Sequence, residues 1–176
     1  MLQDNKSHVR IITIDELSFV REISAENGSI KPDHYWQRCR EGIENNNMNV
    51  LMAFIESVPV GYTILNWKPK YRFYDQFDIP EIQDLNVLMK YRKRGIGQSI
   101  IEACEDRARE KGCSQMGISY GLTREYGAAQ RLYARLGYFP DGLGVTYDRQ
   151  PVTHGQIRPV DDNLCLMLVK DLTLEE

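Results

Sequence analysis

The sequence predicts one domain of mixed α/β fold, spanning residues 1–176, with about six to seven strands and four helices. The first observation is that β-branched apolar runs alternate along the chain with segments whose apolar residues recur at helical spacing. The second is that turns containing glycine or proline separate these segments. The third is the length of 176 residues, which suffices for one substantial core but is short for two.

The first third of the chain predicts a strand, two helices and a hairpin. A β-branched run ends at Asp15, which is placed to cap the helix that follows. Pro59 marks a tight turn between two apolar runs, which are therefore expected to pair antiparallel. The expected elements are a strand at 9–14, helices at 16–24 and 33–44, and strands at 50–55 and 60–67.

Residues 68–79 are rich in aromatic side chains and show no clear periodicity. Two interpretations remain open for this segment. It is either a strand end and loop packed on the surface, or a wall of a substrate site.

The second half predicts strands and helices in alternation. In the strand expected at 81–89, alternation places Glu81 and Asp84 on opposite faces. Gly112 and Gly137 follow the two helices, where glycine commonly ends a helix. The other expected elements are helices at 96–111 and 124–136, and strands at 113–120, 145–147 and 163–169.

Composition and charge exclude several classes of protein. Hydrophobic residues make up 42% and charged residues 27%, and no run of 18 apolar residues occurs. Residues 1–10 lack the apolar stretch of a signal peptide, so we expect no secretory signal, no membrane partner and a cytoplasmic protein. The net charge is −3 and the cations gather in one turn, so no nucleic-acid partner is expected.

Cysteine and histidine are spaced too widely for a metal site. No Cys-x-x-Cys pair occurs, and each histidine is isolated in the sequence. We therefore expect reduced thiols and no metal. The residues concerned are Cys39, Cys104, Cys113, Cys165, His8, His34 and His154.

The turn at residues 91–99 is predicted to bind a phosphate group. Gly95 and Gly97 remove Cβ atoms where backbone passes close to a ligand. The helix that begins there directs unpaired N–H groups and the positive end of its dipole toward an anion. Three consecutive cations add charge at the same place: Arg92, Lys93 and Arg94. A solvated basic helix start is the alternative.

Two common phosphate-binding motifs do not match this turn. A Walker A loop needs Gly-Lys-Ser/Thr, whereas Gln98 and Ser99 follow the second glycine here. A dinucleotide-binding fingerprint needs a third glycine where this chain has Ile100. A protein that binds the phosphates of a nucleotide is therefore the least favoured of the candidate functions.

The pattern Arg-x-x-Gly-x-Gly at residues 92–97 resembles the acetyl-CoA pyrophosphate loop of the GNAT (Gcn-related N-acetyltransferase) superfamily. A second match lies at residues 126–138, where a helix with alanines and the pair Leu132-Tyr133 precedes Gly137. The two motifs occur in the family's order, so the resemblance covers nearly the whole chain. Tyr126 departs from the family, which often has asparagine there, and a core role for Tyr126 is the alternative to a cofactor contact.

This resemblance implies a central mixed β-sheet in which the strand before the turn splays from its parallel neighbour. It implies acetyl-CoA as cofactor, with the pantetheine arm between those strands and the thioester oxygen accepting from the amide of Val87 or Leu88. The cofactor-binding residues that it implies are Leu85, Val87, Leu88, Met89, Arg92, Lys93, Arg94, Gly95, Ile96, Gly97, Gln98, Ser99 and Tyr126.

The implied reaction is transfer of an acetyl group to a primary amine of a small molecule or peptide, by direct attack in a ternary complex. The resemblance implies Tyr133 as general acid for the departing thiolate, with a core tyrosine as the alternative. Glu81 is the candidate general base, and a solvated charge at a strand start is its alternative. Asp84 is a weaker candidate, and either carboxylate could act through water.

The acceptor is the least defined part of the reaction. Acidic residues at 75–84 would suit a cationic amine, although surface acids are usually only solubilising. A non-catalytic module that binds or senses acyl-CoA is the alternative function. Homodimers are common in the superfamily, and no residue here demands one.

Overall fold

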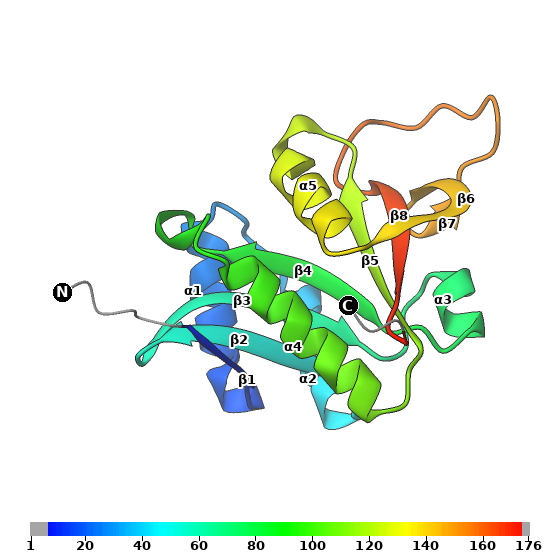
Figure 1. The fold of residues 1–176 in the computed structure, drawn as a ribbon. Helices are drawn as coiled ribbons and strands as arrows, with labels where there is room; N and C mark the ends of the chain where they lie inside the picture. The colour runs from blue at the N-terminus through cyan, green and yellow to red at the C-terminus, as the bar shows by residue number, and fades with distance from the viewer. Residues whose placement is uncertain (1–6, 174–176) are drawn as a thin grey trace. The chain divides into compact units, whose positions relative to one another are not determined.

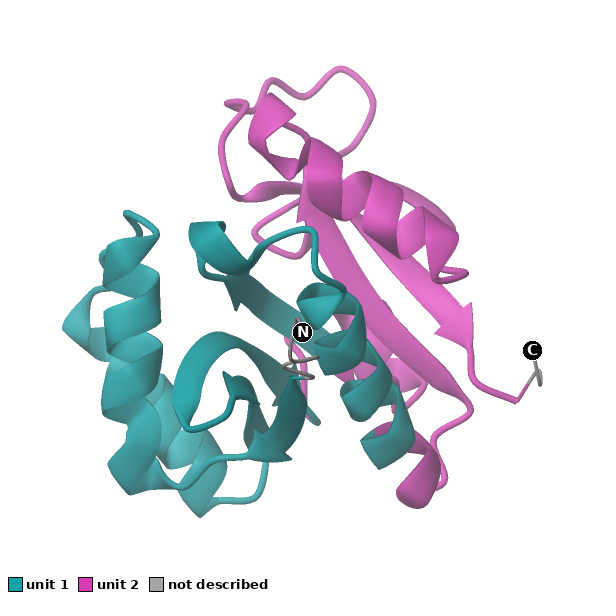
Figure 2. Cartoon of the chain, turned by 60° about the vertical axis from the view of Figure 1, so that its left-hand side comes forward, with its two compact units in different colours: residues 1–67, 82–107 teal, residues 68–81, 108–176 magenta. Residues whose placement is uncertain are grey.

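The computed structural model describes residues 7–173, which contain eight β-strands and five α-helices (Figure 1). The mixed α/β class is therefore confirmed, with eight strands in place of six or seven. The chain divides into two units (Figure 2). The first holds the described residues up to Trp67 together with Ile82–Arg107, and the second holds Lys68–Glu81 and the residues from Ala108 onward. The expectation about a secretory signal falls partly on residues 1–6, which lie outside the described residues.

The first unit contains a sheet in the order β1-β2-β3-β4 and three helices. Strands β1, β2 and β3 pair antiparallel. The predicted strand at 9–14 is shorter than expected, because residues from Ile14 form a 3₁₀ turn, η1 (Ile14–Glu16). The elements are β1 (His8–Ile11), α1 (Leu17–Glu26), α2 (Asp33–Glu44), β2 (Met48–Ile55), β3 (Val58–Asn66), β4 (Glu81–Val87) and α4 (Ile96–Glu110). Glu81 and the last three residues of α4 belong to the second unit.

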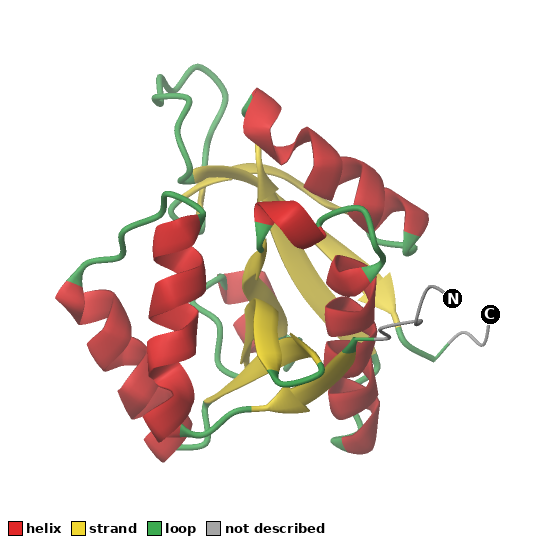
Figure 3. Ribbon diagram, turned by 90° about the vertical axis from the view of Figure 1, so that its left-hand side faces the viewer, coloured by secondary structure: helices red, strands yellow, loops and turns green. Residues whose placement is uncertain are grey.

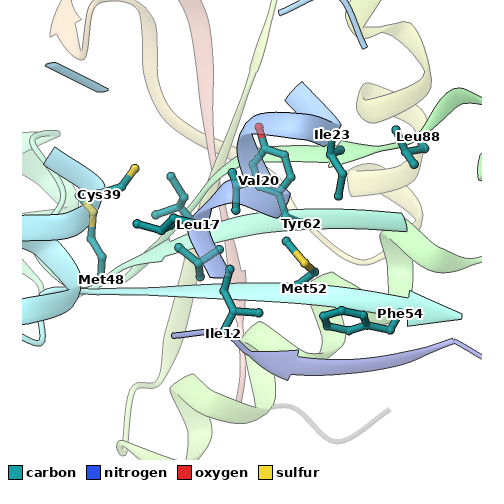
Figure 4. Packing of buried hydrophobic residues seen from close by; sticks show 12 residues of the cluster. Ile12, Leu17, Val20, Ile23, Cys39, Met48, Met52, Phe54, Tyr62 and Leu88 are labelled. Carbon is teal, nitrogen blue, oxygen red and sulfur yellow. The ribbon is translucent and has the colours of Figure 1, made fainter. Parts of the chain in front are cut away.

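Both faces of this sheet are covered, and the alternation along β2 shows how. Met52 and Phe54 lie in one buried cluster with Val20 of α1 and residues of α2 (Figure 4). Ala53, which points the other way, lies in a second cluster with Ile96 and Ile100 of α4. Helices α1 and α2 therefore cover one face and α4 the other (Figure 3). A strand buried on both faces reads as an almost continuous apolar run, as β2 does.

The second unit contains the strand order β5-β8-β6-β7 and two helices. Strand β8 pairs antiparallel with both β5 and β6. Its elements are α3 (Arg72–Gln76), β5 (Gln115–Gly121), η3 (Arg124–Tyr126), α5 (Gly127–Arg135), β6 (Phe139–Tyr147), β7 (Gln150–Pro151) and β8 (Leu164–Asp171). The helix predicted at 124–136 is confirmed as η3 followed by α5, whereas the strand predicted at 145–147 begins much earlier, at Phe139.

The aromatic segment at 68–79 is partly core. Its short helix α3 buries Tyr74 completely, and Tyr71 is only 3% exposed. The hydroxyl of Tyr74 donates to the carbonyl oxygen of Leu168 in β8 and contacts that of Ile118 in β5. The expectation of a loop packed on the surface is therefore wrong for these two tyrosines. They fill the space between α3 and β8.

The four cysteines are free, and three of them, Cys39, Cys104 and Cys165, are buried. Burial raises the pKa of each of these thiols, because a low-dielectric surrounding disfavours the thiolate. Among residues 7–173, no group of three or more histidine, cysteine or acidic side chains is placed to hold a metal. None of the helices in that range is long and apolar enough to cross a membrane.

Two glycines of the first unit provide a test of its packing. A Cβ at Gly61 in β3 would lie 2.8 Å from the carbonyl oxygen of Asn86, which is backbone and cannot easily move. A Cβ at Gly42 in α2 would meet the side chain of Met48, whose sulfur can shift. We expect Gly61→Ala to lower the free energy of unfolding by about 1–3 kcal/mol. Gly42→Ala gains helix propensity and should change it by less than about 1 kcal/mol.

Urea unfolding followed by circular dichroism measures both variants. A larger loss for Gly42→Ala than for Gly61→Ala would contradict the packing described here.

Candidate functional site

Strand β4 leads into the predicted phosphate-binding turn and then into α4 (Figure 1). Leu85 and Val87 are partly buried and pack against the cluster that contains Ile96 of α4. The amide of Leu88 donates to the carbonyl oxygen of Val60 at 2.9 Å. Leu88 is therefore not available as the thioester donor, and of the two amides predicted only that of Val87 remains. Met89 is 73% exposed and begins a 3₁₀ turn, η2 (Met89–Tyr91).

The backbone conformation of the turn leaves several amides at the start of α4 without a backbone hydrogen bond. Lys93 and Gly95 have positive φ values of 61° and 79°, a backbone conformation that favours glycine at position 95. The first hydrogen bond at the start of α4 runs from the amide of Ser99 to the carbonyl oxygen of Gly95 at 3.0 Å. The amides of Ile96, Gly97 and Gln98 therefore precede the first helical bond and have no carbonyl of their own helix to bond.

The positive charge predicted for this turn is present and accessible. Arg92, Lys93 and Arg94 are all exposed. Arg92 is also tied to the strand, because its Nε donates to the carbonyl oxygen of Val87 at 2.9 Å. The guanidinium of Arg94 lies 5.5 Å from the ring centre of Tyr91. Free amides, a helix N-terminus and three cations together fit an anionic group such as a diphosphate.

Tyr133 lies on α5 in the second unit and is 5% exposed. Its ring is near those of Tyr120 and Tyr138, with centres 6.4 and 6.3 Å away. Burial raises the pKa of the Tyr133 hydroxyl, which therefore keeps its proton at neutral pH. No other residue in the described part of the chain hydrogen-bonds to this hydroxyl. These surroundings fit the core interpretation and also suit a proton donor.

Tyr126 has a packing role in the structure. It precedes α5, and its hydroxyl donates to Asp162 at 2.9 Å. A Cβ on Gly121 would lie 2.4 Å from its ring, so the glycine of β5 makes room for the tyrosine. The predicted cofactor contact of Tyr126 stays a prediction.

Glu81 is fully buried, so the alternative of a solvated charge is wrong. Its carboxylate accepts a hydrogen bond from Arg149 at 2.8 Å, and Arg149 keeps only 23% of its side-chain exposure. The charge of Glu81 raises the pKa of Arg149 against the opposing, larger effect of burial. Arg149 and Asp148 both have positive φ in the two-residue turn between β6 and β7. No sequence signal near Glu81 points to this partner.

The predicted alternation holds from Asp84 to Leu88, because Tyr62, which bonds to Asp84, shares one buried cluster with Leu88, whereas Leu85 and Val87 pack in the other. Asp84 nevertheless has an unusual backbone conformation. Its φ is 52°, a left-handed conformation within β4. Its carboxylate is shared among donors from several segments of the first unit, of which Tyr35 and Lys31 are far away in sequence. Within residues 7–173 the donors are Lys31, Tyr35, Tyr62 and Asn86. Sequence reasoning considered Asp84 only as a weaker base and missed this cluster.

Comparison with known proteins identifies the family. The model of the Acetyltransferase (GNAT) family matches residues 14–138, which include both sequence motifs. A sequence search against curated proteins returned no match.

Solved structures show the same fold at low sequence identity. An N-acetyltransferase from Staphylococcus aureus Mu50 is 14% identical with a TM-score of 0.69, over 95% of this chain and 99% of that one. The ribosomal-protein-S18-alanine N-acetyltransferase from Escherichia coli is 12% identical with a TM-score of 0.67, over 97% of each chain. PaiA N-acetyltransferase from Thermoplasma acidophilum, solved with coenzyme A, is 15% identical with a TM-score of 0.60, over 94% and 99%. These structures show a shared fold, and the family match over residues 14–138 places the chain in the GNAT family of acetyltransferases.

Proposed function

We propose that this protein is an N-acetyltransferase that transfers the acetyl group of acetyl-CoA to a primary amine by direct attack in a ternary complex. The observation that carries the proposal is the turn before α4, with its unbonded amides and exposed cations. The amides of Ile96, Gly97 and Gln98 would bind the diphosphate of the cofactor, and Arg92, Lys93 and Arg94 would balance its charge. Coenzyme A bound to one structural neighbour is consistent with this assignment.

Bound acetyl-CoA would supply an activated acyl group as a thioester. The amine nitrogen would form the new C–N bond as the C–S bond breaks. The nitrogen would then lose a proton to a base, for which Glu81 is the candidate, or to water, and the sulfur would receive a proton. Tyr133 is proposed as the donor of that proton, because burial raises its pKa and keeps its hydroxyl protonated. A protonated thiol leaves more readily than a thiolate, so this step would lower the barrier to acyl transfer.

The acceptor is proposed to be a small-molecule or peptidyl amine. A preference for cationic acceptors is less favoured, because three of the four acidic side chains at 75–84 are paired and only Asp75 has no ion pair among the described residues. Asp78 lies 3.5 Å from Lys68, Glu81 pairs with Arg149, and Asp84 pairs with Lys31. The Escherichia coli neighbour is named for an alanine of ribosomal protein S18, which favours peptide N-termini as one set of acceptors to test.

A non-catalytic acyl-CoA sensor remains the second candidate. The observation that favours it is that both candidate bases have protein partners, Arg149 for Glu81 and Lys31 for Asp84. A sensor would bind coenzyme A tightly and release none from acetyl-CoA with any amine in a panel of amino acids, polyamines and peptides. Turnover with any of these amines would exclude it.

The turn before α4 can be tested by calorimetry with coenzyme A. We expect the wild-type protein to bind it, and the triple variant Arg92→Ala/Lys93→Ala/Arg94→Ala to bind about tenfold to a hundredfold more weakly. The difference should shrink as salt is raised, because accessible charges are screened. Arg40→Ala/Arg72→Ala/Arg135→Ala removes the same charge from exposed positions elsewhere and should bind as wild type does. A folded wild-type protein that ignores millimolar coenzyme A would refute the assignment.

Tyr133→Phe tests the proposed proton donor. Without the hydroxyl, kcat should fall by about a hundredfold, whereas the dissociation constant of coenzyme A should stay within about twofold. Steady-state kinetics and calorimetry on the same preparation separate the two quantities. Tyr120→Phe, which changes a neighbouring ring of the same cluster, is the control and should retain its activity. Wild-type turnover in Tyr133→Phe would leave Tyr133 with a packing role only.

The pair of Glu81 and Arg149 tests the assignment of the base, which stays a prediction. Arg149→Met removes the guanidinium that pairs with the buried carboxylate of Glu81 and should lower the free energy of unfolding by about 3–5 kcal/mol. We expect Glu81→Gln to lower kcat no more than Arg149→Met does, measured below the unfolding transition of both. A loss of about a hundredfold in kcat for Glu81→Gln, with Arg149→Met still active, would instead assign Glu81 as general base.

A further inference from the structure

Asp84 departs from regular strand conformation at the strand that leads into the cofactor-binding turn. Its φ of 52° is uncommon for a residue other than glycine, although aspartate tolerates this region better than most. A residue in a sparsely populated conformation persists only where its surroundings hold it there. The side chain of Asp84 shows what these surroundings are.

The carboxylate of Asp84 accepts four hydrogen bonds. Oδ1 accepts from Nζ of Lys31 at 3.1 Å and from Nδ2 of Asn86 at 2.9 Å. Oδ2 accepts from the hydroxyl of Tyr62 at 3.1 Å and from that of Tyr35. A carboxylate offers about four lone-pair sites, so all are in use. Asp84 therefore has no site left for a proton from an amine, and its arrangement is that of an anchor.

The four donors come from separate parts of the first unit. Lys31 precedes α2, Tyr35 lies on α2, Tyr62 on β3 and Asn86 on β4 itself. Burial, followed by the charge of Asp84, raises the pKa of both tyrosines, so their hydroxyls remain protonated donors at neutral pH. The ion pair is sheltered, with side-chain exposures of 23% for Lys31 and 18% for Asp84. Such a pair is screened by salt less than a surface pair.

A second set of contacts links this cluster to the turn before α4. Asn27, at the end of α1, donates through Nδ2 to Oδ1 of Asn86 at 3.4 Å and to the carbonyl oxygen of Val87 at 3.3 Å. The same carbonyl of Val87 accepts from Nε of Arg92 at 2.9 Å. The contacts thus run from Asp84 through Asn86, Asn27 and Val87 to the first cation of the turn.

We propose that Asp84 is a positioning residue for acyl transfer. Its carboxylate holds the left-handed residue in β4, and thereby sets the path of residues 85–88 and the placement of Arg92 at the cofactor. The inference rests on the proposed function, because positioning matters here only if the turn binds acyl-CoA. Asp84 acts through the backbone and through Asn86 and does not itself take part in the chemistry.

The test uses variants that remove the anchor in different ways. Asp84→Asn keeps the size of the side chain and tolerates positive φ, but places an NH₂ group against donors. Asp84→Gly allows the left-handed backbone without any anchor. Tyr35→Phe and Lys31→Met each remove one donor without changing the sequence of β4. They therefore provide the test if the Asp84 variants do not fold. Tyr147→Phe is the matched control, since it removes a hydroxyl that donates to Asp161 in the second unit.

Two measurements are made on each full-length variant. Hydrogen exchange of the free protein reports on residues 85–92, with β2 as internal reference, and calorimetry with coenzyme A reports affinity. In the four anchor variants we expect exchange at 85–92 to rise by about tenfold while β2 is unchanged, because only the local opening becomes easier. Affinity for coenzyme A should fall by about tenfold, and kcat/KM for acetyl-CoA should fall at least as much. Tyr147→Phe should match wild type in every measurement.

The outcomes separate this inference from the proposed function. Wild-type exchange and wild-type affinity in Tyr35→Phe and Lys31→Met, while the wild-type protein binds coenzyme A, would overturn the role of Asp84 and leave the function standing. Wild-type exchange and wild-type affinity in Asp84→Gly would overturn the role of Asp84 too. A residue that only permits positive φ would then suffice without the carboxylate. Failure of the wild-type protein itself to bind coenzyme A would overturn the proposed function and, with it, the role of Asp84 in acyl transfer.

Discussion

The hydrogen bonds to the carboxylate of Asp84 are the constraint that joins the elements of the first unit around strand β4. Asp84 is left-handed within β4, and the side chains after it keep alternating between the two faces of the sheet. Its donors include Tyr35 of α2 and Tyr62 of β3, so the carboxylate of Asp84 joins this helix and this strand to β4. The turn before α4, with its unbonded amides, comes directly after this strand in the chain.

The parts of the fold that could be predicted are those with a local cause. The apolar spacing of residues 96–108 predicts α4 to within a residue at its C-terminal end, and Gly112 ends it with a φ of 78°. Gly95 lies at positive φ in the turn, where glycine is favoured, and a glycine in a turn before a helix is a local signal that needs no distant partner. The motif around Tyr133 is equally local, since α5 brings its residues together within a few turns.

The parts that could not be predicted depend on partners far away in the sequence. Arg149 lies 68 residues from Glu81, and Tyr35 lies 49 residues from Asp84, so neither pairing leaves a local pattern. The positive φ of Asp84 also leaves no local signal, because the side chains from 84 to 88 keep the expected period of two. Helix α3 has five residues, too few for a helical period to show, and the burial of Tyr74 comes from β8, much later in the chain.

The burial of the cysteines has a practical consequence for measuring the reaction. Each turnover of an acetyltransferase releases coenzyme A, which carries a free thiol that a chromogenic thiol reagent can capture. Cys39, Cys104 and Cys165 are buried, and their raised pKa values keep them as unreactive thiols. In the folded enzyme the dye signal should therefore come from product, with Cys113, which is partly exposed, as the main protein background.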